Sequence, residues 1–212
     1  GKQGYPYLFA AIVIRPCSCV LNFLSLNSTH KEPNVKRLSL LICLAVLAGC
    51  SPHPKAPSGL LEISFQFNDP DSFDPSFQLA VWLESEADSI HTLFVSEYLS
   101  YGGYNDTTIC PHWSKQADWD HSTDEEFDAV TRATPPLGAN TLSFDLDTLN
   151  LQPGNYQLWM QTHVEAETNV LVSSDLNFRE PFASQPEPVA EPPNPATRQV
   201  LTDVQISFKP EK

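Results

Sequence analysis

Short segments in which apolar and polar residues alternate constrain this chain more than any other feature of its sequence. The first is residues 61–67, where four apolar side chains alternate with Glu62, Ser64 and Gln66. A period of two places successive side chains on opposite faces, so the segment predicts a β-strand with one buried face. Similar segments lie at residues 77–83, 91–98, 141–146, 155–163, 169–177 and 201–208. About seven short strands predict an all-β, immunoglobulin-like β-sandwich.

The alternation also assigns faces within the strands. In residues 77–83, the inward row contains Leu79, Val81 and Leu83, and Trp82 lies on the opposite face. In residues 91–98, the same reasoning places Leu93 and Val95 on one face and Phe94 on the other.

The segment before the strands has the layout of an export signal. Lys36 and Arg37 precede an apolar run at residues 38–47, and Ala48 and Gly49 precede Cys50. The run is too short for a membrane span, because ten helical residues cover about 15 Å of the roughly 30 Å of hydrocarbon. We therefore expect a signal peptide at residues 35–49, with Cys50 as the first residue of the mature chain.

The residues around Cys50 resemble a bacterial lipobox, which implies lipid modification of the Cys50 thiol and anchoring to a membrane. The residue after Cys50 is Ser51, not the aspartate associated with retention in the inner membrane. The resemblance therefore implies that the anchor lies in the periplasmic face of the outer membrane. We expect a proline-containing tether at residues 50–58. Residues 1–34 are expected to be translated upstream sequence, with Val35 at an alternative start codon; a genuine N-terminal extension is the other reading.

The rest of the chain is strongly acidic, because every Asp and Glu except Glu32 follows Cys50 and the formal net charge of the whole chain is −14. Such a field repels nucleic acid, so we expect no nucleic-acid partner. Residues 59–212 are long enough for a single β-sandwich domain. They include a proline-rich stretch at residues 181–197, which we interpret as a long loop before the last strand.

A long irregular segment at residues 99–136 interrupts the strand pattern. It is rich in acidic and aromatic residues, and loops of this length are usually functional or disordered. Its five aromatic side chains favour order. Ser122 or Thr123 is a candidate N-cap of a short helix that ends near Asp128, with Glu125 or Glu126 completing a capping box.

This segment also contains weak candidates for a metal site, namely Cys110, His112 and His121. Their side chains are of the types that zinc prefers, but their spacing matches no zinc pattern, so the expectation is that they bind no metal. A metal-binding lipoprotein stays open as a further hypothesis for the function. The chain also lacks a nucleophile elbow, so we predict no enzyme.

One motif points to a specific chemistry. Residues 128–134 read Asp-Ala-Val-Thr-Arg-Ala-Thr and resemble the flavinylation motif of proteins that carry FMN as a phosphoester on threonine. The resemblance implies that Thr134 is the attachment residue and that Asp128 and Thr131 present the segment to a flavin transferase. Arg132 stands where the motif has glycine. A side chain there costs roughly 1–2 kcal/mol if the backbone is left-handed, whereas a guanidinium can also pair with the FMN phosphate.

The wider sequence is similar to a predicted periplasmic family, domain of unknown function 2271. The similarity rests on residues 61–67, 102–104, 113–119, 128–136, 153–156 and 201–208. It implies association with flavin transferases and PepSY-type membrane proteins, and hence electron transfer outside the cytoplasm. Tyr104, Trp113 and Trp119 are the expected stacking partners of the flavin ring.

We therefore expect a lipid-anchored periplasmic accessory protein of a redox or iron-related system, with FMN carried on Thr134. The alternative is a cofactor-free interaction module that binds a protein partner through residues 99–136.

Overall fold

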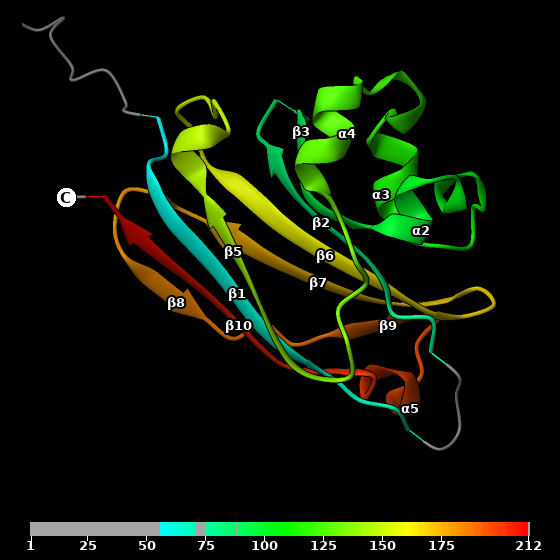
Figure 1. The fold of residues 1–212 in the computed structure, drawn as a ribbon. Coiled ribbons are helices and arrows are strands. Elements are labelled where there is room, and N and C mark those ends of the chain that lie inside the picture. The colour runs from blue at the N-terminus through cyan, green and yellow to red at the C-terminus, as the bar shows by residue number, and fades with distance from the viewer. Residues whose placement is uncertain (1–55, 71–74, 88, 212) are drawn as a thin grey trace, which may run out of the picture. The chain divides into compact units, whose positions relative to one another are not determined.

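The computed structural model describes residues 56–70, 75–87 and 89–211. The expectations for the upstream sequence, the signal peptide and Cys50 lie outside these residues, as does most of the expected tether. Within the described part, ten strands form two sheets that pack face to face as an all-β sandwich (Figure 1). No helix in this part is both long and apolar enough to cross a membrane.

The smaller sheet is antiparallel throughout. Its order is β5 (Gly138–Asp145), β1 (Gly59–Phe67), β10 (Leu201–Pro210) and β8 (Phe182–Ser184). The alternation predicted for residues 61–67 of β1 is confirmed, because the four apolar side chains there are buried and the three intervening polar ones are partly exposed. Ile63 is central, pairing with Leu142 on one side and Ile206 on the other.

The larger sheet has the order β4 (Thr131–Arg132), β3 (Ile90–Ser96), β2 (Gln78–Ser85), β6 (Tyr156–Glu165), β7 (Thr168–Leu176) and β9 (Val189–Glu191). Only β4 runs parallel to its neighbour, β3; the other pairs are antiparallel. All seven predicted strands are present, and β4, β8 and β9 are short additions at sheet edges.

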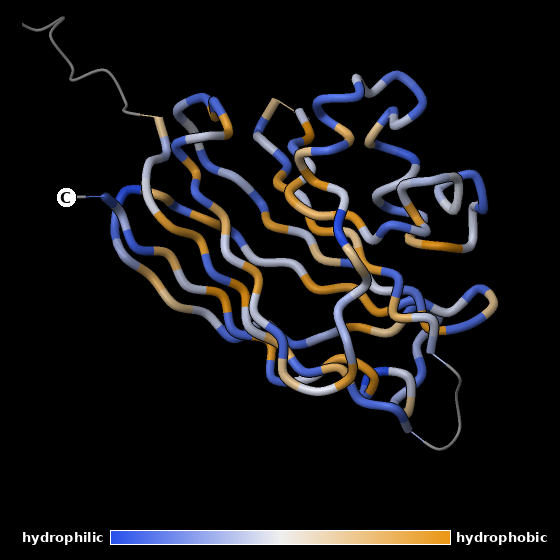
Figure 2. The backbone as a smooth tube through the Cα atoms, in the orientation of Figure 1, coloured by the Kyte–Doolittle hydropathy of each residue, from blue (hydrophilic) through white to orange (hydrophobic). Residues whose placement is uncertain are grey.

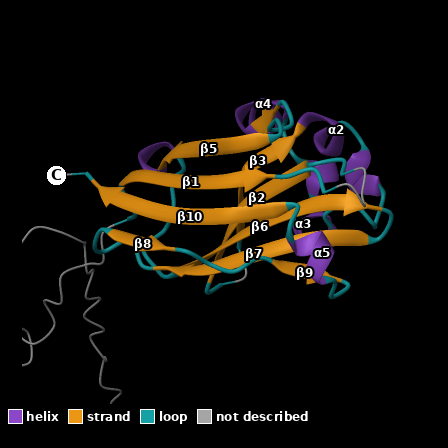
Figure 3. Ribbon diagram, turned by 90° about the horizontal axis from the view of Figure 1, so that it is seen from below, coloured by secondary structure: helices purple, strands orange, loops and turns teal. Residues whose placement is uncertain are grey.

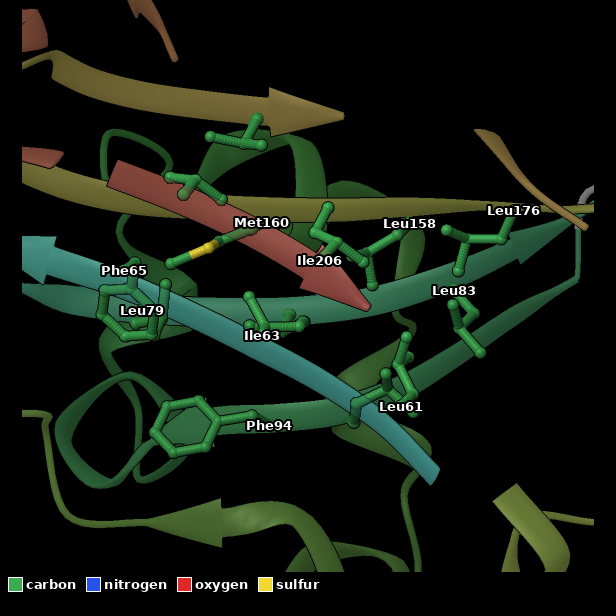
Figure 4. Close-up of a cluster of buried hydrophobic side chains, with 14 of the residues drawn as sticks. Leu61, Ile63, Phe65, Leu79, Leu83, Phe94, Leu158, Met160, Leu176 and Ile206 are labelled. Atoms are coloured by element: carbon green, nitrogen blue, oxygen red, sulfur yellow. The ribbon is translucent and has the colours of Figure 1, made fainter. Parts of the chain in front are cut away.

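The main core lies between the two sheets (Figure 4). Leu61 and Ile63 of β1 face Leu79 and Leu83 of β2, and all four are fully buried. Burying each such side chain contributes roughly 1.5–3 kcal/mol. The alternating colours along the strands in Figure 2 show the sequence pattern that produces this layer.

The outer face of the larger sheet is covered by a second layer, which we call the helical cap (residues 97–130). Its elements are α2 (Glu97–Ser100), η1 (Gly103–Asn105), α3 (Pro111–Gln116), η2 (Trp119–His121) and α4 (Asp124–Val130). Figures 1 and 3 show the cap grouped beside β2 and β3. The expectation of an irregular loop at residues 99–136 was therefore wrong, because most of the segment is helical.

The cap and the sheet share a second apolar cluster, the cap cluster. Its buried members are Ala80, Trp82, Val95, Leu99, Ile109, Cys110, Trp113, Trp119 and Leu171. The predicted outward position of Trp82 is confirmed, but that face is covered rather than solvated. Since both of its faces are buried, β2 lies in the interior of the molecule.

The face assignment of β3 was wrong at Leu93. Val81 pairs with Phe94, whereas Trp82 pairs with Thr92, so Leu93 is an extra residue in the β3 ladder. Such a bulge resets the alternation. As a result, Leu93 and Phe94 both belong to the main core and Val95 belongs to the cap cluster.

The proline-rich stretch at residues 181–197 was also predicted incorrectly as a plain loop. It contributes β8 to the edge of the smaller sheet and β9 to the edge of the larger one. It also contains the start of α5 (Pro195–Arg198). Ala190 is buried, so the stretch covers core as it crosses from one sheet edge to the other.

The turn before β6 ends in an aromatic residue, after the 3-10 turn η3 (Leu146–Thr148). The Tyr156 hydroxyl donates a hydrogen bond of 2.6 Å to the carbonyl oxygen of Gln152. A tyrosine that bonds back to the chain a few residues upstream is typical of immunoglobulin-like sandwiches.

Candidate functional site

Two polar side chains of the sheet hold the cap in place. The Gln161 Oε1 atom on β6 accepts hydrogen bonds from the backbone N–H groups of His112 (3.0 Å) and Trp113 (3.5 Å). These donors lie in the first turn of α3, where a helix has no carbonyl partners of its own. Asn169 on β7 accepts from the Cys110 N–H at 3.0 Å and donates to the Thr108 carbonyl at 2.9 Å.

The Cys110 side chain points into the cap cluster and is fully buried. Its thiol donates to the carbonyl oxygen of Gln161, with an Sγ···O distance of 3.3 Å. Burial raises the pKa of the Cys110 thiol far above its ordinary value. A protonated, enclosed thiol is a poor nucleophile and a poor metal ligand.

The three weak metal candidates do not come together. The His112 ring bonds to Glu191 at 2.7 Å, where the cap meets β9, and His121 bonds to Asp118 at 2.8 Å on the exposed side of the cap. That bond raises the pKa of His121. Among the described residues, no group of three potential ligands is arranged around one point.

The segment that resembles a flavinylation motif, residues 128–134, begins in α4, whose predicted capping box is present. Thr123 Oγ1 accepts from the Glu126 N–H, and the Glu126 carboxylate accepts from the Thr123 N–H at 2.8 Å. These bonds lower the pKa of Glu126. The helix contains Asp128 in an exposed position and ends at Val130, where the chain turns directly into β4.

Residues 131 and 132 pair with the end of β3, at Val95 and Ser96. The hydroxyl oxygens of Thr131 and Ser100 are 2.7 Å apart, which ties β4 to α2. Arg132 is exposed and has an extended, not left-handed, backbone. An extended position accepts any residue, so arginine is unstrained where the motif has glycine.

Thr134 follows at the junction of the cap and the sandwich. Its side chain is partly exposed, and Pro135 after it is buried. The Gln78 Nε2 atom, at the start of β2, donates to Thr134 Oγ1 at 3.3 Å. The motif thus runs from a capped helix through a paired strand to a threonine with a fixed neighbour.

The sequence model of one family, DUF2271, a predicted periplasmic protein, matches residues 68–190, which is more than half of the 212 residues. The chain belongs to the DUF2271 family. No curated protein and no solved structure matches it. The DUF2271 match includes the whole cap and residues 128–134 but neither β1 nor β10.

Two of the three aromatic residues expected to stack on a flavin, Trp113 and Trp119, are buried in this DUF2271 protein. Trp113 and Trp119 are at most 7% exposed and pack against each other with ring centroids 5.2 Å apart. Their indole N–H groups donate to Thr92 and Ser100. These rings are part of the cap cluster and offer no open face. Tyr104 is partly exposed, and its hydroxyl donates to Asp120, which raises the pKa of Tyr104.

The open aromatic faces belong to Tyr98 of α2 and to Tyr101, the residue directly after α2. The sequence predicted a strand end at the first and an irregular loop at the second. Tyr98 is 60% exposed and Tyr101 is 69% exposed. Tyr101 contacts Phe127 edge to face at 4.9 Å. Tyr98 lies so close to Gly103 that a Cβ there would be 2.8 Å from its ring. Two adjacent glycines, at residues 102 and 103, were the available signal that a ring packs on that turn.

Proposed function

We propose that this DUF2271 protein is a periplasmic accessory protein of an electron-transfer system and carries FMN as a phosphoester on Thr134. One observation carries the proposal. Residues 128–134, which resemble a flavinylation motif, lie at the surface, with Thr134 partly exposed and Arg132 unstrained.

The residues around Thr134 fit such a group. Arg132 is exposed two residues before it and has five N–H donors suited to a phosphate. Tyr98 lies on α2, and Tyr101 is the residue directly after it. The Ser100 hydroxyl of α2 contacts that of Thr131 in β4. The exposed rings of the two tyrosines suit an isoalloxazine ring.

Attachment needs a phosphorylated donor and a transferase. The Thr134 oxygen forms a bond to the FMN phosphorus of a dinucleotide donor, the diphosphate bond breaks and AMP leaves, and a base of the transferase takes the hydroxyl proton. Bound FMN supplies one- and two-electron redox chemistry. The chain's own residues then hold the phosphate and limit the motion of the ring.

The proposed location of this chemistry is the periplasm, at a membrane. The DUF2271 family is described as periplasmic, and the lipobox-like sequence before Cys50 supports a lipid anchor, in the outer membrane according to Ser51. The proposed partners are a flavin transferase, which loads Thr134, and a PepSY-type membrane protein, which exchanges electrons with the flavin.

Co-expression tests the attachment. The mature protein is produced with a flavin transferase, and intact mass and in-gel fluorescence after denaturation report covalent flavin. We expect one FMN per chain, no adduct in Thr134→Val, and a normal adduct in the matched control Thr141→Val, which changes an exposed threonine of β5. A wild-type chain with the bare polypeptide mass rules the proposal out.

A second candidate is a cofactor-free module that binds a protein partner through the cap. The exposed Tyr98 and Tyr101 favour it, because aromatic side chains are enriched in interface centres. In that case Tyr98→Ala and Tyr101→Ala weaken partner binding, whereas Thr134→Val has no effect on it.

A further inference from the structure

Gln78 is the described side chain whose polar group contacts the Thr134 hydroxyl. Its Nε2 atom is 3.3 Å from Thr134 Oγ1 and 3.3 Å from the carbonyl oxygen of Ser76. The Gln78 backbone is fixed from another direction, since its carbonyl accepts a bond of 3.1 Å from the Thr162 hydroxyl. The amide is therefore held at the start of β2 and directed toward the motif.

The other end of this amide is unusual. The Gln78 Oε1 atom is buried and has no hydrogen-bond partner among the described residues. Buried side-chain oxygens are nearly always bonded, and exceptions need an explanation. The observed orientation gives the Nε2 group two acceptors, Thr134 Oγ1 and the carbonyl oxygen of Ser76, and leaves Oε1 unpaired.

The contact has a chemical consequence for the hydroxyl. A threonine hydroxyl has one donor and two acceptor lone pairs. The Gln78 N–H occupies one lone pair, and the proton and the second lone pair remain available to other groups. The second lone pair can then attack an incoming phosphorus while the proton leaves to an external base.

We propose that Gln78 is a positioning residue for the modification of Thr134; this inference rests on the proposed function. Gln78 directs the Thr134 oxygen toward the transferase. After transfer, the same N–H can donate to a phosphate oxygen, which is a stronger acceptor than a neutral hydroxyl. The contact joins residues 56 positions apart, so it forms only in the folded chain.

The test measures the rate of adduct formation by intact mass with purified flavin transferase and flavin adenine dinucleotide, using the mature wild-type protein and three variants. Gln78→Glu keeps the shape of the side chain but loses the N–H donor, Gln78→Ala removes the amide, and Gln205→Ala changes an exposed glutamine of β10. Melting temperatures and circular dichroism establish that each variant is folded.

We expect kcat of transfer to fall roughly five- to ten-fold in Gln78→Ala, the size of one lost neutral hydrogen bond, with little change in KM for the protein substrate. Gln78→Glu is expected to fall further, because a carboxylate repels the incoming phosphate. The difference in kcat between Gln78→Glu and wild type is expected to decrease as the pH falls, because the protonated carboxyl group can donate a hydrogen bond. Gln205→Ala matches wild type.

The outcomes distinguish the attachment of FMN to Thr134 from the positioning role of Gln78. A wild-type chain that takes no FMN overturns both the proposed function and the role of Gln78. A wild-type chain that is loaded at the same rate as folded Gln78→Glu and Gln78→Ala overturns the role of Gln78 and leaves the FMN carrier standing. A rise in KM without a change in kcat also contradicts positioning, since it assigns Gln78 to docking.

Discussion

Asn169 on β7 accepts a hydrogen bond of 3.0 Å from the backbone N–H of Cys110, the residue before α3. The Asn169 side chain is 2% exposed and also donates to the carbonyl of Thr108. A single buried amide thus joins the sandwich to the turn from which the cap helices continue.

Replacing Asn169 tests this join. Asn169→Ala leaves a backbone donor and acceptor unpaired beneath the cap, so we expect the free energy of unfolding to fall by about 2–4 kcal/mol. Urea denaturation followed by tryptophan fluorescence measures it. Ser173→Ala, an exposed change on the same strand, serves as the control. Equal stability of the two variants contradicts the role assigned to Asn169.

Cys110 is expected to resist thiol reagents. Residues 51–212 contain Cys110 as their one cysteine, so a chain of these residues is used. Burial keeps the thiol protonated and inaccessible, so a disulfide reagent at pH 8 labels this native chain only at the rate at which the cap opens. The same reagent labels the chain at once in denaturant. Absorbance of the released thiolate follows both reactions, and rapid stoichiometric labelling of native protein disproves the burial.

His91 gives stability a pH dependence. Burial beside Tyr156 lowers the pKa of His91 below its ordinary value of 6.5. The unfolded chain therefore binds a proton more readily, and the free energy of unfolding falls as the pH drops through 6.5. Urea midpoints from pH 8 to 5 are expected to fall less steeply in His91→Gln.

His121 is expected to contribute to the pH dependence of stability with the opposite sign to His91. Asp118 raises the pKa of His121, so its contribution is present below pH 6.5 and is lost as the pH rises through the raised value. His121→Gln is therefore expected to steepen the loss of stability at low pH. A shallower loss in that variant contradicts the assignment.

Gly103 is expected to tolerate no side chain. An alanine Cβ at this position meets the Tyr98 ring at 2.8 Å and the Tyr98 carbonyl oxygen at 2.9 Å. We expect Gly103→Ala to cost roughly 1–3 kcal/mol and to shift the Tyr98 ring. Gly154→Ala is the matched control, because a Cβ there meets nothing within 4 Å. Thermal melting and the Tyr98 ring resonances report the two effects.

Arg132→Gly is expected to leave the final FMN stoichiometry unchanged. Because residue 132 is extended, glycine relieves no backbone strain there. Intact mass after co-expression with the transferase measures the yield. An adduct that appears only in Arg132→Gly shows that the arginine obstructs the transferase through its side chain.

Local patterns predicted most of the sandwich and one element of the cap. Period-two alternation located all seven longer strands, and Thr123 with Glu126 predicted the start of α4. These features depend on residues close in sequence. The bulge at Leu93 has no such signal, because it arises from how β3 pairs with β2.

The candidate site was harder to predict because its contacts are distant in sequence. Trp113 and Trp119 were interpreted as surface aromatics, since nothing nearby in the chain shows that Trp82 and Leu171 cover them. The contact between Gln78 and Thr134 likewise depends on the folded sheet. Thr134 itself came from motif resemblance, which required no knowledge of the fold.

The pairing of Val95 with Thr131 means that the chain leaves and re-enters the larger sheet at adjacent points. The cap is therefore topologically an insertion between two neighbouring strands. Such an insertion can be replaced in a related protein without changing the order of the strands in the sandwich. The surface beneath it limits that freedom: a version lacking the cap would expose Ala80, Trp82 and Leu171. Diversification within such a lineage should thus preserve the underside of the insert and vary its outward residues, including α2.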